Sequence, residues 1–326
     1  MATMAMKGKV CVTGAGGFIG SWLVKLLLSR DYIVHGTVRE PSDAKYAHLR
    51  KLEKATENLQ LFKADLLDYQ SLRSAIAGCD GVFHVACPVP STTSSNPETE
   101  VIEPAVKGTH NVLEACVEAK VKRVVVVSSV AAVFSNPSWP RSRVMDESCW
   151  SDMEHCRASK DWYFLAKTEA ESEALAFGKR RGLDVVTICP TLVIGPVLQP
   201  TVNASTLALL RILKGLFAEG CESMENRPRT LVDVRDVAEA LILLYEKREA
   251  EGRYICTAHS IETRELVDAL KSKYPDYSYP KKLSEWKAEP ISLSSEKLQR
   301  LGWKYRALEE TLADAVQSFQ DAGMLE

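Results

Sequence analysis

One stretch near the N-terminus decides the fold that this sequence predicts: residues 10–20, which read Val10-Cys11-Val12-Thr13-Gly14-Ala15-Gly16-Gly17-Phe18-Ile19-Gly20. Residues 9–13 are strand-like, and apolar residues then recur at helical spacing up to Leu28. Gly14 permits a sharp turn, Gly17 lets the backbone approach a phosphate closely, and Gly20 lets the helix pack on the strand. The free amides at the helix N-terminus would then face the pyrophosphate of a dinucleotide.

The composition is that of an ordinary soluble globular protein. The chain has 326 residues, of which 46% are hydrophobic and 26% charged, enough for one large or two fused domains. A net charge of −2 gives no reason to expect a nucleic-acid or membrane partner. No signal core and no apolar run of ~20 residues is present. Nine scattered cysteines fit reduced thiols in the cytoplasm, and no Cys or His spacing indicates a metal site.

Strand-like and helix-like segments alternate after the glycine turn. We expect strands at 33–38, 59–63, 82–86, 124–127 and 184–189, and helices at about 99–119 and 159–181. This alternation predicts an α/β fold with a doubly wound parallel sheet of the Rossmann type. Residues 136–159 read as irregular, and residues 88–97 as a Ser/Thr/Pro-rich loop.

The pattern loosens after Thr191. We expect a loop near Gly195, helices at 205–216 and 233–247, a short strand at 253–256, and helices near Glu262 and Leu308. The predicted dinucleotide-binding domain is 1–195, to which 225–258 returns. Residues 196–224 and 259–326 would form a smaller substrate-binding lobe.

The second strand ends at Arg39, where an NAD-specific site usually carries an acidic residue for the ribose hydroxyls. An arginine suits a 2′-phosphate instead, and Lys45 would add a second cation. The sequence therefore favours NADP(H), against the alternative of a solvated basic residue at a strand end. His84 lies inside an apolar run, which favours a core histidine over a catalyst.

Tyr163 and Lys167 are four residues apart on a predicted helix, so they share one face. A nearby ammonium stabilises a phenolate, which suits Tyr163 to give a proton to a carbonyl oxygen as hydride arrives. Ser129, after a strand, would hydrogen-bond the developing alkoxide. Tyr277 and Lys281 have the same spacing, but Pro280 lies between them and prevents a common helical face.

These motifs together resemble the extended short-chain dehydrogenase/reductases. Within them, the chain resembles the plant branch that holds cinnamoyl-CoA reductases, dihydroflavonol reductases and related aromatic aldehyde reductases. The similarity runs from about Lys7 to Gly302. Five segments carry it: Thr37-Val38-Arg39, Ala64-Asp65-Leu66, Val85-Ala86-Cys87-Pro88, residues 103–109 and Cys189-Pro190-Thr191-Leu192-Val193-Ile194-Gly195-Pro196. The resemblance implies NADP(H) as cofactor, with Ser129, Tyr163 and Lys167 as catalytic residues. It implies these cofactor-binding residues: Thr13, Gly14, Gly16, Gly17, Phe18, Ile19, Arg39, Lys45, Asp65, Leu66, Val85, Ala86, Cys87, Tyr163, Lys167, Pro190, Thr191, Leu192, Val193 and Ser205.

Residues 146–152 are close to cinnamoyl-CoA reductases, but two positions depart from them. Those enzymes carry cysteine and tyrosine where this chain has Phe164 and Leu165, which suggests a more apolar wall around an aromatic ring. They also carry a histidine, implicated in recognising CoA, where this chain has Ala208, followed by Arg211.

The departures favour an NADPH-dependent reductase of hydroxycinnamaldehyde-type aldehydes, similar to a cinnamyl-alcohol dehydrogenase of phenylpropanoid and monolignol metabolism. The alternative is a cinnamoyl-CoA reductase, and a third possibility is an NADP-sensing protein without chemistry. The expected partner is a small aromatic carbonyl compound, and the expected state is a cytoplasmic monomer or weak dimer. Cys149 and Cys156 lie near the predicted catalytic helix, either as two reduced thiols or as a pair whose oxidation alters access to the cleft.

Overall fold

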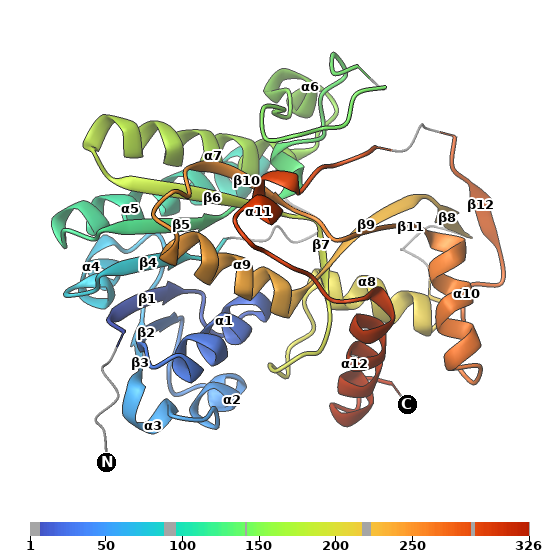
Figure 1. Cartoon of the computed structure of the whole chain (residues 1–326), viewed down its shortest axis with the longest axis horizontal. Coiled ribbons are helices and arrows are strands. Elements are labelled where there is room, and N and C mark those ends of the chain that lie inside the picture. Colours follow the sequence, from blue (N-terminus) through green and yellow to red (C-terminus); the bar gives the residue numbers. More distant parts are fainter. Residues whose placement is uncertain (1–6, 88–95, 141, 217–222, 288–290, 326) are drawn as a thin grey trace.

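The computed structural model describes residues 7–87, 96–140, 142–216, 223–287 and 291–325. Its main sheet is built from β1 (Lys9–Thr13), β2 (Ile33–Val38), β3 (Leu59–Lys63), β4 (Gly81–His84), β5 (Arg123–Val127), β6 (Asp184–Pro190) and β10 (Gly252–Cys256). The seven strands are all parallel, in the order β10-β6-β5-β4-β1-β2-β3 (Figure 1). This is the doubly wound Rossmann-type sheet that the sequence predicts.

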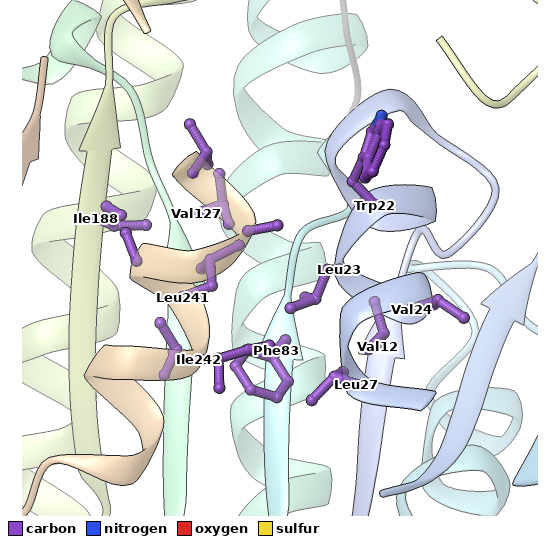
Figure 2. Packing of buried hydrophobic residues seen from close by; sticks show 14 of the residues in the cluster. Val12, Trp22, Leu23, Val24, Leu27, Phe83, Val127, Ile188, Leu241 and Ile242 are labelled. Atoms are coloured by element: carbon purple, nitrogen blue, oxygen red, sulfur yellow. The ribbon is translucent and has the colours of Figure 1, made fainter. Parts of the chain in front are cut away.

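Helices cover both faces of this sheet (Figure 1). One face carries α1 (Phe18–Ser29) and α9 (Val234–Glu246), and the other carries α4 (Tyr69–Ile76), α5 (Glu103–Glu118) and α7 (Trp162–Arg181). Figure 2 shows side chains of α1 and α9 meeting over β4, where Phe83 is fully buried. Every residue of β5 is buried, which explains its continuous run of valines.

The strand order reverses between β1 and β4. Ligands of open α/β sheets bind outside the carboxyl ends of the strands at such a reversal. The glycine turn after β1, residues 85–87 after β4 and Ser129 after β5 all lie at this edge. The topology therefore brings the predicted cofactor and catalytic segments to one place.

A smaller group of elements follows β6. Strands β7 (Leu192–Ile194), β9 (Pro228–Asp233) and β11 (His259–Glu262) form a second sheet, and β8 (Met224–Asn226) pairs with β12 (Leu283–Glu285). Helices α8 (Ala204–Leu213), α10 (Thr263–Lys273) and α12 (Leu308–Asp321) share a separate hydrophobic cluster with this sheet. The short helices are η1 (Ala44–Tyr46), α2 (Ala47–Arg50), α3 (Ala55–Asn58), η2 (Glu98–Ile102), η3 (Val130–Ala132), α6 (Met153–Ala158) and α11 (Glu296–Arg300).

Several predicted boundaries move for local reasons. The helix expected from Ser159 begins at Trp162, because Lys160 has a left-handed φ of 61°. The strand expected at 82–86 ends at His84, because the amides of Val85 and Ala86 donate to a side chain instead of a strand. The helix expected at 99–119 opens with one π-helical turn, η2, and α5 starts afresh with Pro104 in its first turn.

Other elements were absent from the sequence prediction. Within the segment expected to be irregular lies α6, whose N-terminus is capped by Asp152 (2.9 Å to the amide of His155). Asp68 caps α4 in the same way. The strands β7 and β9 are also additions to the pattern expected after Thr191. Of the predicted loop at 88–97, only residues 96 and 97 lie within the described residues.

No helix of the described residues is long and apolar enough to cross a membrane.

Candidate active site

The glycine turn is packed too tightly for side chains at three positions. Gly14 has a φ of 68°, and a Cβ there would lie 2.9 Å from the Cα of Ala86. A Cβ on Gly20 would lie 2.2 Å from the carbonyl oxygen of Gly14. Gly16 faces a contact that the sequence did not reveal, because its Cβ would lie 2.3 Å from the ring of Tyr46. No described side chain caps α1 and its first turn has no acidic residue, so the helix N-terminus suits a pyrophosphate.

A chain of buried hydrogen bonds connects the end of β1, just before the glycine turn, to β4 and α5. Thr13 Oγ1 lies 2.9 Å from His84 Nδ1 and accepts from the amides of Val85 and Ala86 at 3.1 Å. His84 Nε2 reaches Thr109 Oγ1 at 3.2 Å, and that hydroxyl donates to the carbonyl of Ala105. Burial and, to a smaller extent, the charge of Lys167 lower the pKa of His84 to about 3, so the ring stays neutral. His84 is a core residue, as expected, and the fully buried Thr13 links the end of β1 to the segment after β4.

The next two residues of the predicted set lie in α1. Phe18 is buried in the core cluster of that sheet face, and Ile19 is partly buried against it. Among the glycines of the turn, Gly17 alone is exposed and without a close neighbour, since a Cβ there would meet nothing nearer than 3.4 Å.

The two predicted cations differ in their surroundings. Arg39 follows β2, is exposed, and has no hydrogen bond or ion pair with any described residue. Lys45 forms an ion pair with Asp43 (2.8 Å) and lies 5.0 Å from the centre of the Tyr46 ring. The sequence analysis did not identify Asp43 as a partner of Lys45, and its carboxylate partly neutralises the charge of the Lys45 ammonium. Arg39 is therefore the better placed of the two to meet a phosphate.

Five more of the predicted cofactor-binding residues lie at the ends of β3 and β4. Asp65 is exposed, and its Oδ1 accepts from the amide of Leu67 at 2.9 Å. The carbonyl of Leu66 accepts from Asn111 Nδ2 at 2.8 Å, which ties this turn to α5. Val85, Ala86 and Cys87 are all partly exposed at the same edge.

The catalytic candidates surround the end of β5. Ser129 caps η3, its Oγ accepting from the amide of Ala131 at 3.2 Å. Tyr163 is half-buried in the first turn of α7, and Lys167 is buried one turn later, donating to the carbonyl of Val127 at 3.2 Å. Burial lowers the pKa of Lys167, but Cys87, Tyr163 and Glu171 outweigh burial and raise it above its usual value. The ammonium therefore remains charged beside the phenol. The competing pair fails as expected, since residues 277–281 are not helical.

Glu171 is a further residue of this helix face, and sequence reasoning missed it. It is fully buried, and its carboxylate accepts from Ser128 Oγ (2.7 Å), Thr187 Oγ1 (2.6 Å) and Arg253 Nε (2.8 Å). The available signal was its spacing, four residues beyond Lys167.

The remaining predicted residues lie where the main sheet gives way to the second one. Pro190 ends β6, the amide of Thr191 donates to the carbonyl of Cys256 at 3.1 Å, and Leu192 and Val193 begin β7. Ser205 is half-buried in the first turn of α8.

The two residues predicted to form an apolar wall differ in exposure. Phe164 is partly exposed, and its ring meets Phe134 edge-on with centroids 5.2 Å apart. Leu165 is fully buried in the cluster with Val101 and Cys156, against which Phe164 also packs, so Leu165 lines no cleft.

A small hollow in the second sheet includes Ala208 of α8 and Arg229 of β9 among apolar side chains. Arg229 Nε donates to Thr263 Oγ1 at 2.9 Å, and no described carboxylate lies within ion-pair distance of its guanidinium. Burial and the neighbouring Arg227 lower the pKa of Arg229 to about 10, which leaves it charged at neutral pH.

The cysteine pair behaves as two separate buried thiols. Cys149 lies in one core cluster, and Cys156, on α6, lies in another. Burial raises the pKa of both, that of Cys149 to about 11, which disfavours the reactive thiolate. No group of metal-ligating side chains occurs among the described residues.

Comparisons with known proteins agree with this geometry. The model of the NAD dependent epimerase/dehydratase family matches residues 10–256. Cinnamoyl-CoA reductase 2 of Medicago truncatula is 47% identical over 319 residues, which cover 97% of this chain and 92% of the relative. The crystal structure of vestitone reductase from alfalfa (Medicago sativa) matches with a TM-score of 0.84 at 35% identity, over 98% of this chain and 100% of the other. Gre2 from Candida albicans, solved in complex with NADPH, matches with a TM-score of 0.82 at 28% identity, over 96% and 99% of the two chains.

Proposed function

The chain belongs to the NAD dependent epimerase/dehydratase family, and from this premise we propose that it reduces hydroxycinnamoyl-CoA thioesters to aldehydes with NADPH. It is an oxidoreductase of the extended short-chain dehydrogenase/reductase type and uses NAD(P)H. One observation carries the choice of thioester: 47% identity to a cinnamoyl-CoA reductase across nearly the whole of both chains. This reverses the preference for an aldehyde substrate that the sequence motifs suggested.

When bound, NADPH would supply a hydride to the thioester carbonyl carbon. The C–S bond would then break as the proton on the former carbonyl oxygen passes to the leaving sulfur, which releases the aldehyde and the CoA thiol. In this proposal Tyr163 gives its proton to the carbonyl oxygen, and the charged Lys167 stabilises the phenolate that remains. Ser129 donates a hydrogen bond to the same oxygen as negative charge develops on it. The exposed Arg39 meets the 2′-phosphate, which selects NADPH over NADH.

A CoA substrate also needs a cation away from the reacting carbon, for its phosphates. Ala208 supplies none, but Arg229 lies in the same hollow and has no described carboxylate partner. We propose that Arg229 provides this charge. Replacing it by leucine should raise the KM for feruloyl-CoA by about tenfold, in line with the loss of one charge-assisted contact, and leave the KM for coniferaldehyde unchanged. An equal rise for both substrates would show that Arg229 shapes the lobe without recognising CoA.

The second candidate is the reduction of hydroxycinnamaldehydes to alcohols. Its support is the aromatic wall of Phe134 and Phe164 together with the missing polar group at Ala208. Steady-state assays with NADPH separate the candidates: a higher kcat/KM for feruloyl-CoA than for coniferaldehyde supports the thioester, and the opposite order supports the aldehyde. If neither compound supports NADPH oxidation, the remaining candidate is an NADP-sensing protein without chemistry.

The division into a cofactor domain (1–195 with 225–258) and a substrate lobe (196–224 and 259–326) remains part of the proposal. So does the expectation of a cytoplasmic monomer or weak dimer, which analytical ultracentrifugation tests.

A further inference from the structure

A buried ion pair lies directly behind the proposed catalytic residues. The side chains of Glu171 on α7 and Arg253 on β10 are 0% and 6% exposed, and Arg253 Nε is 2.8 Å from Glu171 Oε1. Burying such a pair costs desolvation free energy, and well-packed apolar residues often stabilise a core equally well. Stability alone therefore does not explain the pair, and its position beside the proposed catalytic residues suggests a role in catalysis.

Glu171 ties the catalytic helix to the strands beneath it. Its carboxylate accepts hydrogen bonds from Ser128 after β5 and from Thr187 and Cys189 of β6. Ser128 immediately precedes Ser129, so the bond from Ser128 Oγ (2.7 Å) fixes the backbone from which Ser129 projects. Glu171 also follows Lys167 by one helical turn.

Arg253 ties the turn that begins with Ser129 to the loop above it. Its guanidinium donates to the carbonyls of Ala132 (3.2 Å), Cys149 (2.7 Å) and Glu147 (3.1 Å), and lies 3.4 Å from the centre of the Trp150 ring. Ala132 is the last residue of η3, whose first cap is Ser129. The ion pair thus contacts both ends of the Ser129 turn, one through each partner.

The charges around Lys167 define the electrostatic side of this arrangement. The neutral His84 of β4 and Cys87, in the segment after β4, face the ammonium, and from α7 so do Tyr163 and Glu171. Glu171 in turn faces Arg253 and Cys189. Glu171 is the one carboxylate among these groups, so it supplies a negative charge behind Lys167 on the side away from Tyr163.

We propose that Glu171 and Arg253 are positioning residues for carbonyl reduction: together they hold Ser129 toward the carbonyl oxygen and keep Lys167 charged beside Tyr163. This inference rests on the proposed reductase function, and neither residue touches the substrate.

The test uses Glu171→Gln, which keeps the shape and removes the charge, and Ser128→Ala, which removes one link to Ser129. With NADPH and feruloyl-CoA, Glu171→Gln should lower kcat by about tenfold or more, change KM and the Kd for NADPH by less than about threefold, and move the alkaline limb of kcat to lower pH. The direction follows because removing a negative charge lowers the pKa of Lys167. Ser128→Ala should lower kcat several-fold without moving that limb. Glu171→Asp keeps the negative charge, so its alkaline limb should lie at the pH of the wild-type limb.

The matched control is Asp236→Asn, which breaks a second buried contact, between Asp236 and Arg306, away from the site. It should cost stability without moving the pH profile. An unmoved alkaline limb in Glu171→Gln, or an unchanged kcat in Ser128→Ala, would overturn the inference; if Glu171→Gln fails to fold, Ser128→Ala and Glu171→Asp decide.

If the wild type reduces no carbonyl compound, the proposed function fails. Amide hydrogen exchange then tests separately whether the ion pair holds the Ser129 turn in place. The amides of residues 129–134 should exchange faster in Glu171→Gln than in Asp236→Asn. Equal exchange in the two variants would show that the ion pair does not hold the turn.

Discussion

Tyr163 and Lys167 act as one unit at the residue scale, because the buried ammonium stays charged beside the phenol. Tyr163→Phe keeps the ring packing against Phe164 but removes the transferable proton. We expect turnover to fall by ~100-fold or more while NADPH still binds, as fluorescence titration of NADPH would show. Near-normal turnover would move the proton transfer to another residue.

Cofactor choice rests on Arg39, whose charge has no described partner. Arg39→Asp should weaken NADPH binding by roughly one to two orders of magnitude and affect NADH little. Lys45→Ala is the comparison, and its effect should be smaller because Asp43 already neutralises that ammonium. Unchanged NADPH affinity in Arg39→Asp would show that the phosphate is held elsewhere.

The sequence identified residues whose roles depend on near neighbours and missed those that depend on distant ones. Tyr163, Lys167 and Gly14 are recognisable from spacing within one helix or one turn. Tyr46 lies thirty residues beyond Gly16, and Arg253 lies 82 beyond Glu171. Nothing in a local pattern signals such pairs, because the fold alone brings them together.

At the scale of the element, the glycine turn makes a prediction that separates folding from binding. A Cβ on Gly20 would lie 2.2 Å from a backbone oxygen, so Gly20→Ala should destabilise the protein by about 1–3 kcal/mol or more. A Cβ on Gly17 meets nothing nearer than 3.4 Å, so Gly17→Ala should fold normally and yet bind NADPH weakly. Thermal unfolding and NADPH titration of both variants check this, and equal melting temperatures would contradict it.

The strands of the main sheet were predictable almost to the residue, since β1, β2 and β3 have the expected bounds. All three are short and bounded by turns, and β1 and β2 are rich in β-branched residues. Boundaries failed where a single residue departs from the local pattern, as Lys160 does before α7 with its left-handed backbone. Short capped helices such as α4 and α6 failed because their apolar periodicity spans too few residues.

At the scale of the whole molecule, the buried neutral His84 makes stability depend on pH. Its pKa is lowered to about 3, whereas an unfolded histidine titrates near 6.5. The unfolded chain binds the extra proton between these values, so stability is lost as pH falls below about 6.5, by at most about 1.4 kcal/mol per pH unit. Urea unfolding at pH 7 and pH 5 measures this loss.

Two variants test the contribution of His84 to that loss. His84→Gln should reduce the difference in unfolding free energy between pH 7 and pH 5, and His155→Gln, at an exposed position on α6, should preserve it. An undiminished pH dependence in His84→Gln would place the responsible group elsewhere.

The central claim, reduction of a hydroxycinnamoyl-CoA thioester, is tested most directly by competition in one reaction. The enzyme is given equal concentrations of feruloyl-CoA and coniferaldehyde with limiting NADPH, and the products are separated and quantified. We predict that feruloyl-CoA is consumed, with coniferaldehyde and free CoA accumulating together. Formation of coniferyl alcohol while feruloyl-CoA remains intact would contradict the claim.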